Sequence, residues 1–266
     1  MKLHCESEGD GETVVILHGF MGSCENWRAV RTALAGRYRV ACADLPNHGR
    51  SPHVARFDLR SMGDDVIETL DDLGVKRFAV MGHSLGGKVA MQMASDHAER
   101  LRGLIVVDIS PRAIQPVHLF VLRACQQLDL AGAARRADLD AALAKSVPSP
   151  ATRDFLLKNV MRGADGRFVW RVPLASLIDN YRTVSDAPPL VAPCFSPTLF
   201  IAGELSPFRL MKDESLILGW FPAAQFVTIH SAGHLVHADQ PAAFLDAVLR
   251  FLEQVWGNAG RHCPRA

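Results

Sequence analysis

The sequence predicts an α/β fold in which a mostly parallel central sheet is flanked by helices on both faces. Short apolar runs rich in β-branched residues alternate with amphipathic segments, a pattern typical of βαβ units. Most of these runs are almost continuously apolar, as expected for strands that are buried on both faces. The predicted strands are Thr13–Leu17, Tyr38–Cys42, Phe78–Met81, Leu104–Val107, Thr198–Ile201 and Phe226–Ile229.

Apolar residues at spacings of three and four predict two of the helices. The stripes are Leu59, Met62, Val66, Leu70 and Leu73, and then Phe244, Val248, Phe251, Leu252 and Val255. Pro241 provides a start for the second helix, because proline is favoured at the first helical position.

A long stretch without a convincing buried strand separates the fourth predicted strand from the fifth. It covers about 90 residues, and the part from 117 to 161 is rich in helix-favouring Ala, Leu, Arg and Gln. We interpret residues 111–192 as a helical cap, inserted into one domain and lying over the carboxyl edge of the sheet. Residues 1–110 and 193–256 then form the core, and residues 257–266 form a loose tail.

Length and composition limit the classes of function. The 266 residues suffice for one sizeable core. The 29 Lys and Arg against 28 Asp and Glu give no broad positive field, which argues against nucleic acid as a partner. We expect neither a membrane span nor a secretory signal, since no apolar run approaches ~18 residues and the first ten residues lack an apolar region. The six cysteines form no CxxC pair, which favours a cytoplasmic protein.

The segment Gly82–Gly86 is the clearest chemical signal. It reads Gly-His-Ser-Leu-Gly, follows a predicted strand and opens a helical stretch, which is the setting of a nucleophilic serine on a sharp turn. Such a turn brings neighbouring backbone close together, so glycine is needed on both sides of Ser84. The positive end of the helix would favour a developing oxyanion. A glycine-rich turn that merely contains a serine is the alternative interpretation.

A serine hydroxyl needs a base, and His234 is the best candidate. It lies in the segment after the last predicted strand and before the terminal helix, and it follows Ser84 in the chain order Ser, acid, His. For the neighbouring His230 and His237 we expect structural or surface roles.

These motifs together resemble those of the α/β-hydrolase family. The segments that carry the resemblance are His18-Gly19-Phe20, residues 44–51, Gly82–Gly86 and Gly233-His234. More narrowly, PNHGRS, GHSLGGK, VVDISP and AGHLVHA are similar to segments of the small bacterial YbfF-type esterases, which hydrolyse short acyl esters and fatty acyl-CoA thioesters. The resemblance implies an eight-stranded sheet or a slightly reduced version, a cap inserted after the sixth strand, and Ser84 on the nucleophile elbow.

The acid of the triad has two candidates. In the commoner family layout it follows the strand Thr198–Ile201, but here Ser206 stands where Asp is expected. Asp108 ends the strand Leu104–Val107, as in the narrower subgroup, and Glu204 is the local alternative. We favour Asp108, because parallel strands end in one crevice and its carboxylate could orient His234 there. A plain turn or helix-capping role for Asp108 is the competing interpretation.

The oxyanion requires two donors. One is expected to be the backbone N–H of Leu85, directly after the nucleophile, and the other the N–H of Phe20 in the family's HG-x turn. Substrate-binding candidates are the side chains of Phe20, Trp170 and Tyr181, although an aromatic at helical spacing more often packs in the core of a cap.

These observations predict a serine hydrolase that cleaves small carboxylic esters or acyl (CoA) thioesters. No ligand spacing for a metal and no phosphate-binding loop is found, so we expect no metal and no cofactor. Two alternatives stay open: a C–C bond hydrolase or lyase of the same fold, and a non-catalytic ligand receptor. The acyl length and the oligomeric state do not follow from the sequence.

Overall fold

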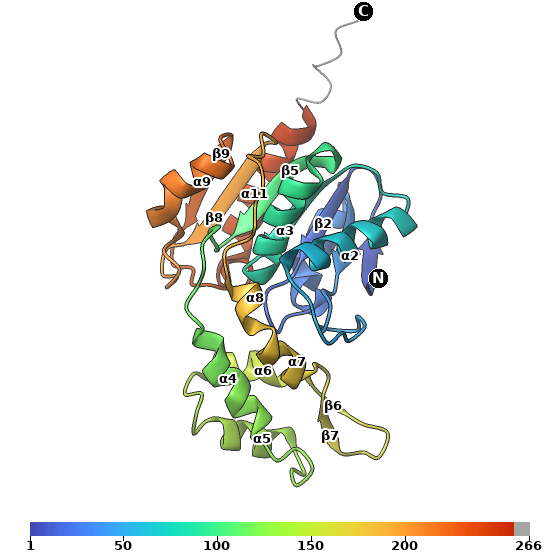
Figure 1. The fold of residues 1–266 in the computed structure, drawn as a ribbon, viewed down its shortest axis with the longest axis vertical. Helices are drawn as coiled ribbons and strands as arrows, with labels where there is room; N and C mark the ends of the chain where they lie inside the picture. Colours follow the sequence, from blue (N-terminus) through green and yellow to red (C-terminus); the bar gives the residue numbers. More distant parts are fainter. Residues whose placement is uncertain (258–266) are drawn as a thin grey trace, which may run out of the picture.

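A seven-stranded sheet forms the centre of the computed structural model, which describes residues 1–257 (Figure 1). Its strands are β1 (Cys5–Glu8), β2 (Thr13–Leu17), β3 (Arg39–Ala43), β4 (Phe78–His83), β5 (Leu101–Val107), β8 (Thr198–Gly203) and β9 (Ala224–Ile229). The strand order is β1-β3-β2-β4-β5-β8-β9, and only β1 runs antiparallel to its neighbour. All six predicted strands are confirmed, with ends that differ by up to three residues.

Helices cover both faces of this sheet, as predicted. One face is covered by α1 (Arg28–Ala35) and α11 (Pro241–Gly257), the other by α2 (Leu59–Asp72) and α3 (Leu85–Asp96). Alternate residues of each strand belong to different apolar clusters: Val14 packs on the α1 and α11 side, and Val15 on the α2 and α3 side. Each fully buried side chain of this size stabilises the fold by about 1.5–3 kcal/mol.

Shorter helical elements lie in the connections between the strands and the longer helices. They are η1 (Cys24–Trp27), η2 (Ala98–Arg100), η3 (Leu210–Asp213), α9 (Glu214–Trp220) and α10 (Val236–Asp239). Pro241 is the first residue of α11, in agreement with the predicted start of the terminal helix. None of the helices within residues 1–257 has the length and apolar character needed to cross a bilayer.

Between β5 and β8 the chain leaves the sheet and forms the helical segment below it in Figure 1. Its elements are α4 (Val117–Gln126), α5 (Arg136–Leu143), α6 (Pro150–Leu157), β6 (Val160–Arg162), β7 (Phe168–Trp170), α7 (Leu174–Asp179) and α8 (Tyr181–Ser185). We call residues 111–192 the cap; the boundaries stay a prediction. Because the sheet has seven strands rather than eight, the insertion follows the fifth strand in chain order, not the sixth. Of the predicted tail, residue 257 ends α11 and residues 258–266 lie outside the described residues.

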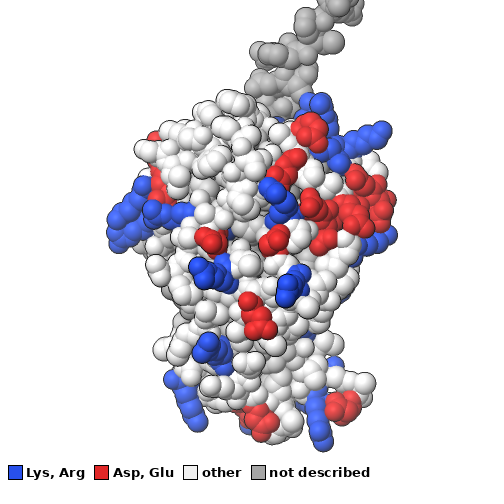
Figure 2. All heavy atoms as spheres, in the orientation of Figure 1, with Lys and Arg blue, Asp and Glu red and all other residues white. Residues whose placement is uncertain are grey.

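The cap is attached to the core by apolar packing and by polar contacts. Cap residues such as Leu156 and Leu177 belong to the same apolar cluster as α2 and α3. The buried Asn159 donates from Nδ2 to the carbonyl of Met21 at 2.8 Å. The Lys88 ammonium, on α3, donates to the carbonyls of Ser185 and Asp186 at the end of α8. Lys and Arg lie interspersed with Asp and Glu over both core and cap on the face in Figure 2.

Candidate active site

Ser84 lies at the sharp turn between β4 and α3, in a strained backbone conformation. Its φ is 52° and its ψ is −115°, a region that costs of order 1–3 kcal/mol and is found mainly at functional sites. A Cβ on Gly82 would lie 2.1 Å from the carbonyl oxygen of Gly86, and one on Gly86 would lie 2.3 Å from that of Leu17. Both distances are impossible for real side chains, so the glycines are needed for the steric reason predicted.

The loop after β2 packs directly against this turn. The amide of Gly86 donates to the carbonyl of His18 at 3.1 Å. A Cβ on Gly19 would lie 2.7 Å from His83 Nδ1 and 3.3 Å from the Cβ of Ser84. The backbone that leads into Phe20 therefore lies beside the serine. Leu85 is the first residue of α3, and an α-helix leaves its first amides without an intrahelical acceptor.

Asp108 and His234 are hydrogen-bonded to each other. Asp108 lies at the end of β5, is fully buried and adopts a left-handed conformation with φ 54°. Its Oδ2 accepts from His234 Nδ1 at 2.7 Å, and its Oδ1 accepts from the amide of Gly203 at 3.0 Å. The hydroxyl of Ser206, at the position where the commoner family layout has its acid, donates to the same Oδ2.

Glu204, the alternative acid, contacts other groups. Its carboxylate accepts from the Ser231 amide at 2.9 Å and lies 3.2 Å from His230 Nδ1. The hydrogen bond from the Ser231 amide holds the pKa of Glu204 below its ordinary value, with a further contribution from His230. His230 is 85% exposed, so this pair lies on the surface, whereas Asp108 lies at the imidazole of His234.

The imidazole of His234 contacts two other rings. Its centroid lies 4.4 Å from that of Phe208 and 4.5 Å from that of His83. His83 Nε2 lies 2.8 Å from the carbonyl oxygen of His234, and since a carbonyl only accepts, Nε2 carries the proton. Burial lowers the pKa of His83 well below its ordinary value, which keeps this ring neutral. Within residues 1–257, no hydrogen bond joins Ser84 to His234.

Three other histidines, His237, His18 and His48, have structural surroundings. His237 is stacked on Trp27 with a centroid separation of 4.0 Å, and burial lowers its pKa to about 4. His18 Nε2 accepts from the Leu45 amide at 3.0 Å, and burial lowers the pKa of His48 to about 3. Among the residues that the structure describes, no three His, Cys, Asp or Glu side chains are grouped to hold a metal ion.

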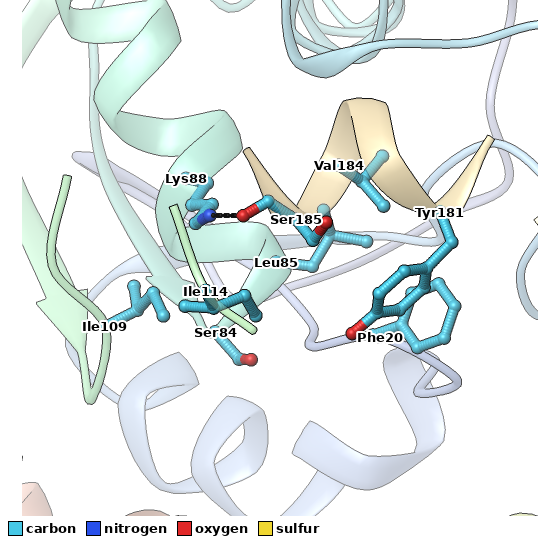
Figure 3. Close-up of a pocket in the computed structure, with 9 residues that line it drawn as sticks. All are labelled: Phe20, Ser84, Leu85, Lys88, Ile109, Ile114, Tyr181, Val184 and Ser185. Atoms are coloured by element: carbon cyan, nitrogen blue, oxygen red, sulfur yellow. Dashed lines mark hydrogen bonds between the residues drawn. The ribbon is translucent and has the colours of Figure 1, made fainter. Parts of the chain in front are cut away.

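A pocket that is open to solvent adjoins Ser84 (Figure 3). The residues that line it are Phe20, Ser84, Leu85, Lys88, Ile109, Ile114, Tyr181, Val184 and Ser185. Of the predicted substrate contacts, Phe20 and Tyr181 lie here, with ring centroids 5.5 Å apart. Trp170 does not line this pocket. It ends the hairpin strand β7 and packs, partly buried, against the apolar cluster, so for Trp170 the reading as a core aromatic holds.

Five residues of this pocket were not predicted from the sequence: Lys88, Ile109, Ile114, Val184 and Ser185. The first follows the nucleophile motif by one helical turn, and a side chain four positions after Ser84 lies on the same helix face. That spacing could have indicated Lys88. Ile109 directly follows Asp108, and the other three come from the cap, whose packing on α3 joins residues about 30 to 100 positions apart in sequence.

The model of the alpha/beta hydrolase fold family matches residues 12–241. The chain belongs to this family. It is 34% identical over 247 residues to the sn-1-specific diacylglycerol lipase ABHD11 of Mus musculus, covering 90% of this chain and 80% of the relative. It is 28% identical to Esterase YbfF of Escherichia coli, covering 93% and 95%. A solved structure described as a marine microorganism esterase superimposes with a TM-score of 0.91 and is 34% identical, covering 94% of this chain and 99% of the other.

These comparisons confirm the resemblance to the α/β-hydrolase family, including the YbfF esterase, and the fold class. The relatives named here are esterases and a lipase, which supports a hydrolase of that class.

Proposed function

We propose that this α/β-hydrolase is a serine hydrolase that cleaves small carboxylic esters or acyl thioesters through an acyl-enzyme. Ser84 is the nucleophile, His234 the general base and acid, and Asp108 the carboxylate that orients the imidazole. The observation that supports this best is the 2.7 Å hydrogen bond between Asp108 and His234, at the same sheet edge as the strained serine. The carboxylate fixes the tautomer in which Nε2 is free to accept a proton.

In the first half-reaction, Ser84 Oγ attacks the carbonyl carbon and its proton passes to His234 Nε2. The amides of Phe20 and Leu85 donate to the oxyanion of the tetrahedral intermediate. The bond from the carbonyl carbon to the leaving oxygen or sulfur then breaks, and His234 returns the proton to the leaving alcohol or thiol. In the second half-reaction, water attacks the acyl carbon and gives a proton to His234. The bond from the acyl carbon to Ser84 Oγ then breaks, and His234 returns the proton to Oγ, which releases the acid and the free serine.

The hydrogen bond from Ser84 to His234 forms on substrate binding in this proposal. Catalytic hydrogen bonds are often long or misaligned in the free enzyme and tighten in the reacting complex. The side chain of His234 is 24% exposed, and Ser84 lines a pocket that is open to solvent. An ester that enters from solvent could therefore reach both side chains.

The lining of the pocket beside Ser84 supports an acyl group as its occupant. Most of this lining is apolar, which fits the acyl group of an ester. A lipase and esterases among the relatives favour an oxygen ester. An acyl-CoA thioester is the second substrate class. The cytoplasmic location stays a prediction from the cysteine pattern.

A substrate panel tests the proposal. We expect the wild type to hydrolyse p-nitrophenyl acetate and butyrate, and Ser84→Ala to lose at least about a thousandfold in kcat. Acetyl- and butyryl-CoA, followed through the released thiol, separate ester from thioester preference. Cleavage of a vinylogous diketone without ester hydrolysis would instead identify a C–C hydrolase. Ligand binding without any turnover would identify a receptor.

A further inference from the structure

Lys88 is a buried amino group that the proposed mechanism does not use. It lies on α3, one turn after Ser84, and only 1% of its surface is exposed. Its Nζ donates to the carbonyl of Ser185 at 2.7 Å and to that of Asp186 at 2.6 Å. Within residues 1–257, no carboxylate lies within ion-pair distance of Nζ. The ammonium is therefore balanced by backbone carbonyls.

Burial of the Lys88 ammonium lowers the stability of the fold, and an apolar side chain at this position would avoid that cost. Desolvation lowers the pKa of Lys88 to about 8, although the charge of Asp186 acts in the opposite direction. Burial of a charge without an ion-pair partner opposes folding. The two carbonyls are the compensation, and they belong to the end of α8, where the last carbonyls of a helix have no intrahelical donor.

The same helix forms one wall of the pocket beside Ser84. Tyr181, Val184 and Ser185 of α8 line the pocket together with Leu85 and Lys88 of α3. Figure 3 shows the Lys88 side chain reaching from α3 to Ser185, with Val184 and Tyr181 further along α8. A displacement of the end of α8 from α3 would therefore change the size of the pocket.

We infer that Lys88 is a specificity-determining residue, which holds α8 against α3 and thereby restricts the pocket to short acyl chains. This inference rests on the proposed ester hydrolysis, since it assigns the pocket to the acyl group. The ammonium reaches across from the helix that carries the nucleophile, so the wall is fixed relative to Ser84 itself. Without these donors the end of α8 loses its hydrogen bonds from α3 and keeps the one from the Ile114 amide to the Ser185 carbonyl, and longer chains gain room.

The test compares acyl-length profiles. Lys88→Met keeps an unbranched side chain and removes the donors, and Lys76→Met, at an exposed lysine, is the matched control. The measured quantity is the ratio of kcat/KM for p-nitrophenyl octanoate to that for the acetate. We expect this ratio to rise about tenfold in Lys88→Met, the worth of a modest change in a hydrophobic pocket, and to stay at the wild-type value in Lys76→Met.

An unchanged ratio in a folded Lys88→Met protein, or an equal loss on both esters, would overturn the inference, because a merely structural role affects both alike. If Lys88→Met does not fold, Val184→Ala enlarges the same wall directly. A higher ratio in that variant supports the inference, and an unchanged ratio overturns it. Acetate hydrolysis by the wild type that is lost in Ser84→Ala establishes the proposed function separately. Absence of all ester hydrolysis overturns both.

Discussion

Ser84 and Asp108 end two neighbouring parallel strands, and both have positive φ. The Ser84 amide donates to the carbonyl of Val107 at 3.0 Å, so the two turns are coupled by a backbone hydrogen bond. Aspartate tolerates the left-handed region better than most residues. Its position at the end of β5 allows the carboxylate to meet an imidazole that follows β9, because the intervening β8 ends at the same edge.

The choice between the two acids gives a prediction at this scale. Asp108→Asn is expected to lower kcat by about a thousandfold or more, because an amide supports the wrong tautomer of His234. Glu204→Gln removes only a surface contact with Ser231 and His230, and we expect kcat within about threefold of wild type. Steady-state hydrolysis of p-nitrophenyl butyrate measures both. A larger loss in the glutamate variant would reverse the assignment.

Lys88 gives a prediction about stability and pH. The folded-state pKa of about 8 lies below the ordinary value of 10.5, so between these values the unfolded chain binds more protons than the folded one. Wild-type stability relative to Lys88→Met should therefore rise between pH 8 and pH 10.5, by about 3 kcal/mol in total. Guanidinium unfolding of both proteins at several pH values measures this difference. A constant difference across this range would show that burial does not disfavour the ammonium.

At the scale of elements, the cap contacts the loop that carries the proposed oxyanion donor Phe20. Asn159 is buried and donates to the carbonyl of Met21, one residue after Phe20, and Met21 has a φ of 60°. This contact fixes a strained loop whose amide is proposed to hold the oxyanion. The cap would thus position the oxyanion site as well as form the pocket wall.

The matching prediction uses two cap asparagines. Asn159→Asp replaces the donor with an acceptor that faces a carbonyl. We expect kcat to fall about tenfold with little change in KM. Removal of a whole oxyanion donor lowers kcat by more than this, and here the donor is only displaced. Asn180 makes a similar contact, from Nδ2 to the carbonyl of Ala55 at 2.8 Å, away from the oxyanion loop. Asn180→Asp is therefore the control. Equal effects in both variants would argue against positioning by Asn159.

The elements that could be predicted are those with a strong local pattern. The strands β2, β4 and β8 are buried at every residue, and that burial is what their continuous apolarity indicated. β1 was missed because its sequence, Cys-Glu-Ser-Glu, is polar and it lies at the sheet edge. The hairpin of β6 and β7 was missed because each strand has three residues, of which only one is buried.

The candidate site was predictable to a similar extent. Ser84 and His234 follow from a local motif and from chain order, and Asp108 follows from a strand end. The pocket wall does not, because Val184 and Leu85 line the same pocket only through packing between segments far apart in the chain. Trp170 was proposed for the pocket on residue type alone, and its place in a hairpin depends on the fold of the cap.

At the scale of the whole molecule, the cap and one face of the core share a single apolar cluster. We therefore propose that residues 111–192 are an insertion that does not fold independently. Calorimetry of the full chain should show one unfolding transition whose calorimetric and van't Hoff enthalpies agree. Two resolved transitions, with the fluorescence of Trp170 following one of them, would show an independent cap.

The nucleophilic role of Ser84 is the central claim, and covalent labelling tests it most directly. A fluorophosphonate probe, followed by peptide mass spectrometry, should place one adduct on Ser84. Ser84→Ala should remain unlabelled, and His234→Ala should react much more slowly. Labelling at another residue, or undiminished labelling of Ser84→Ala, would contradict the account.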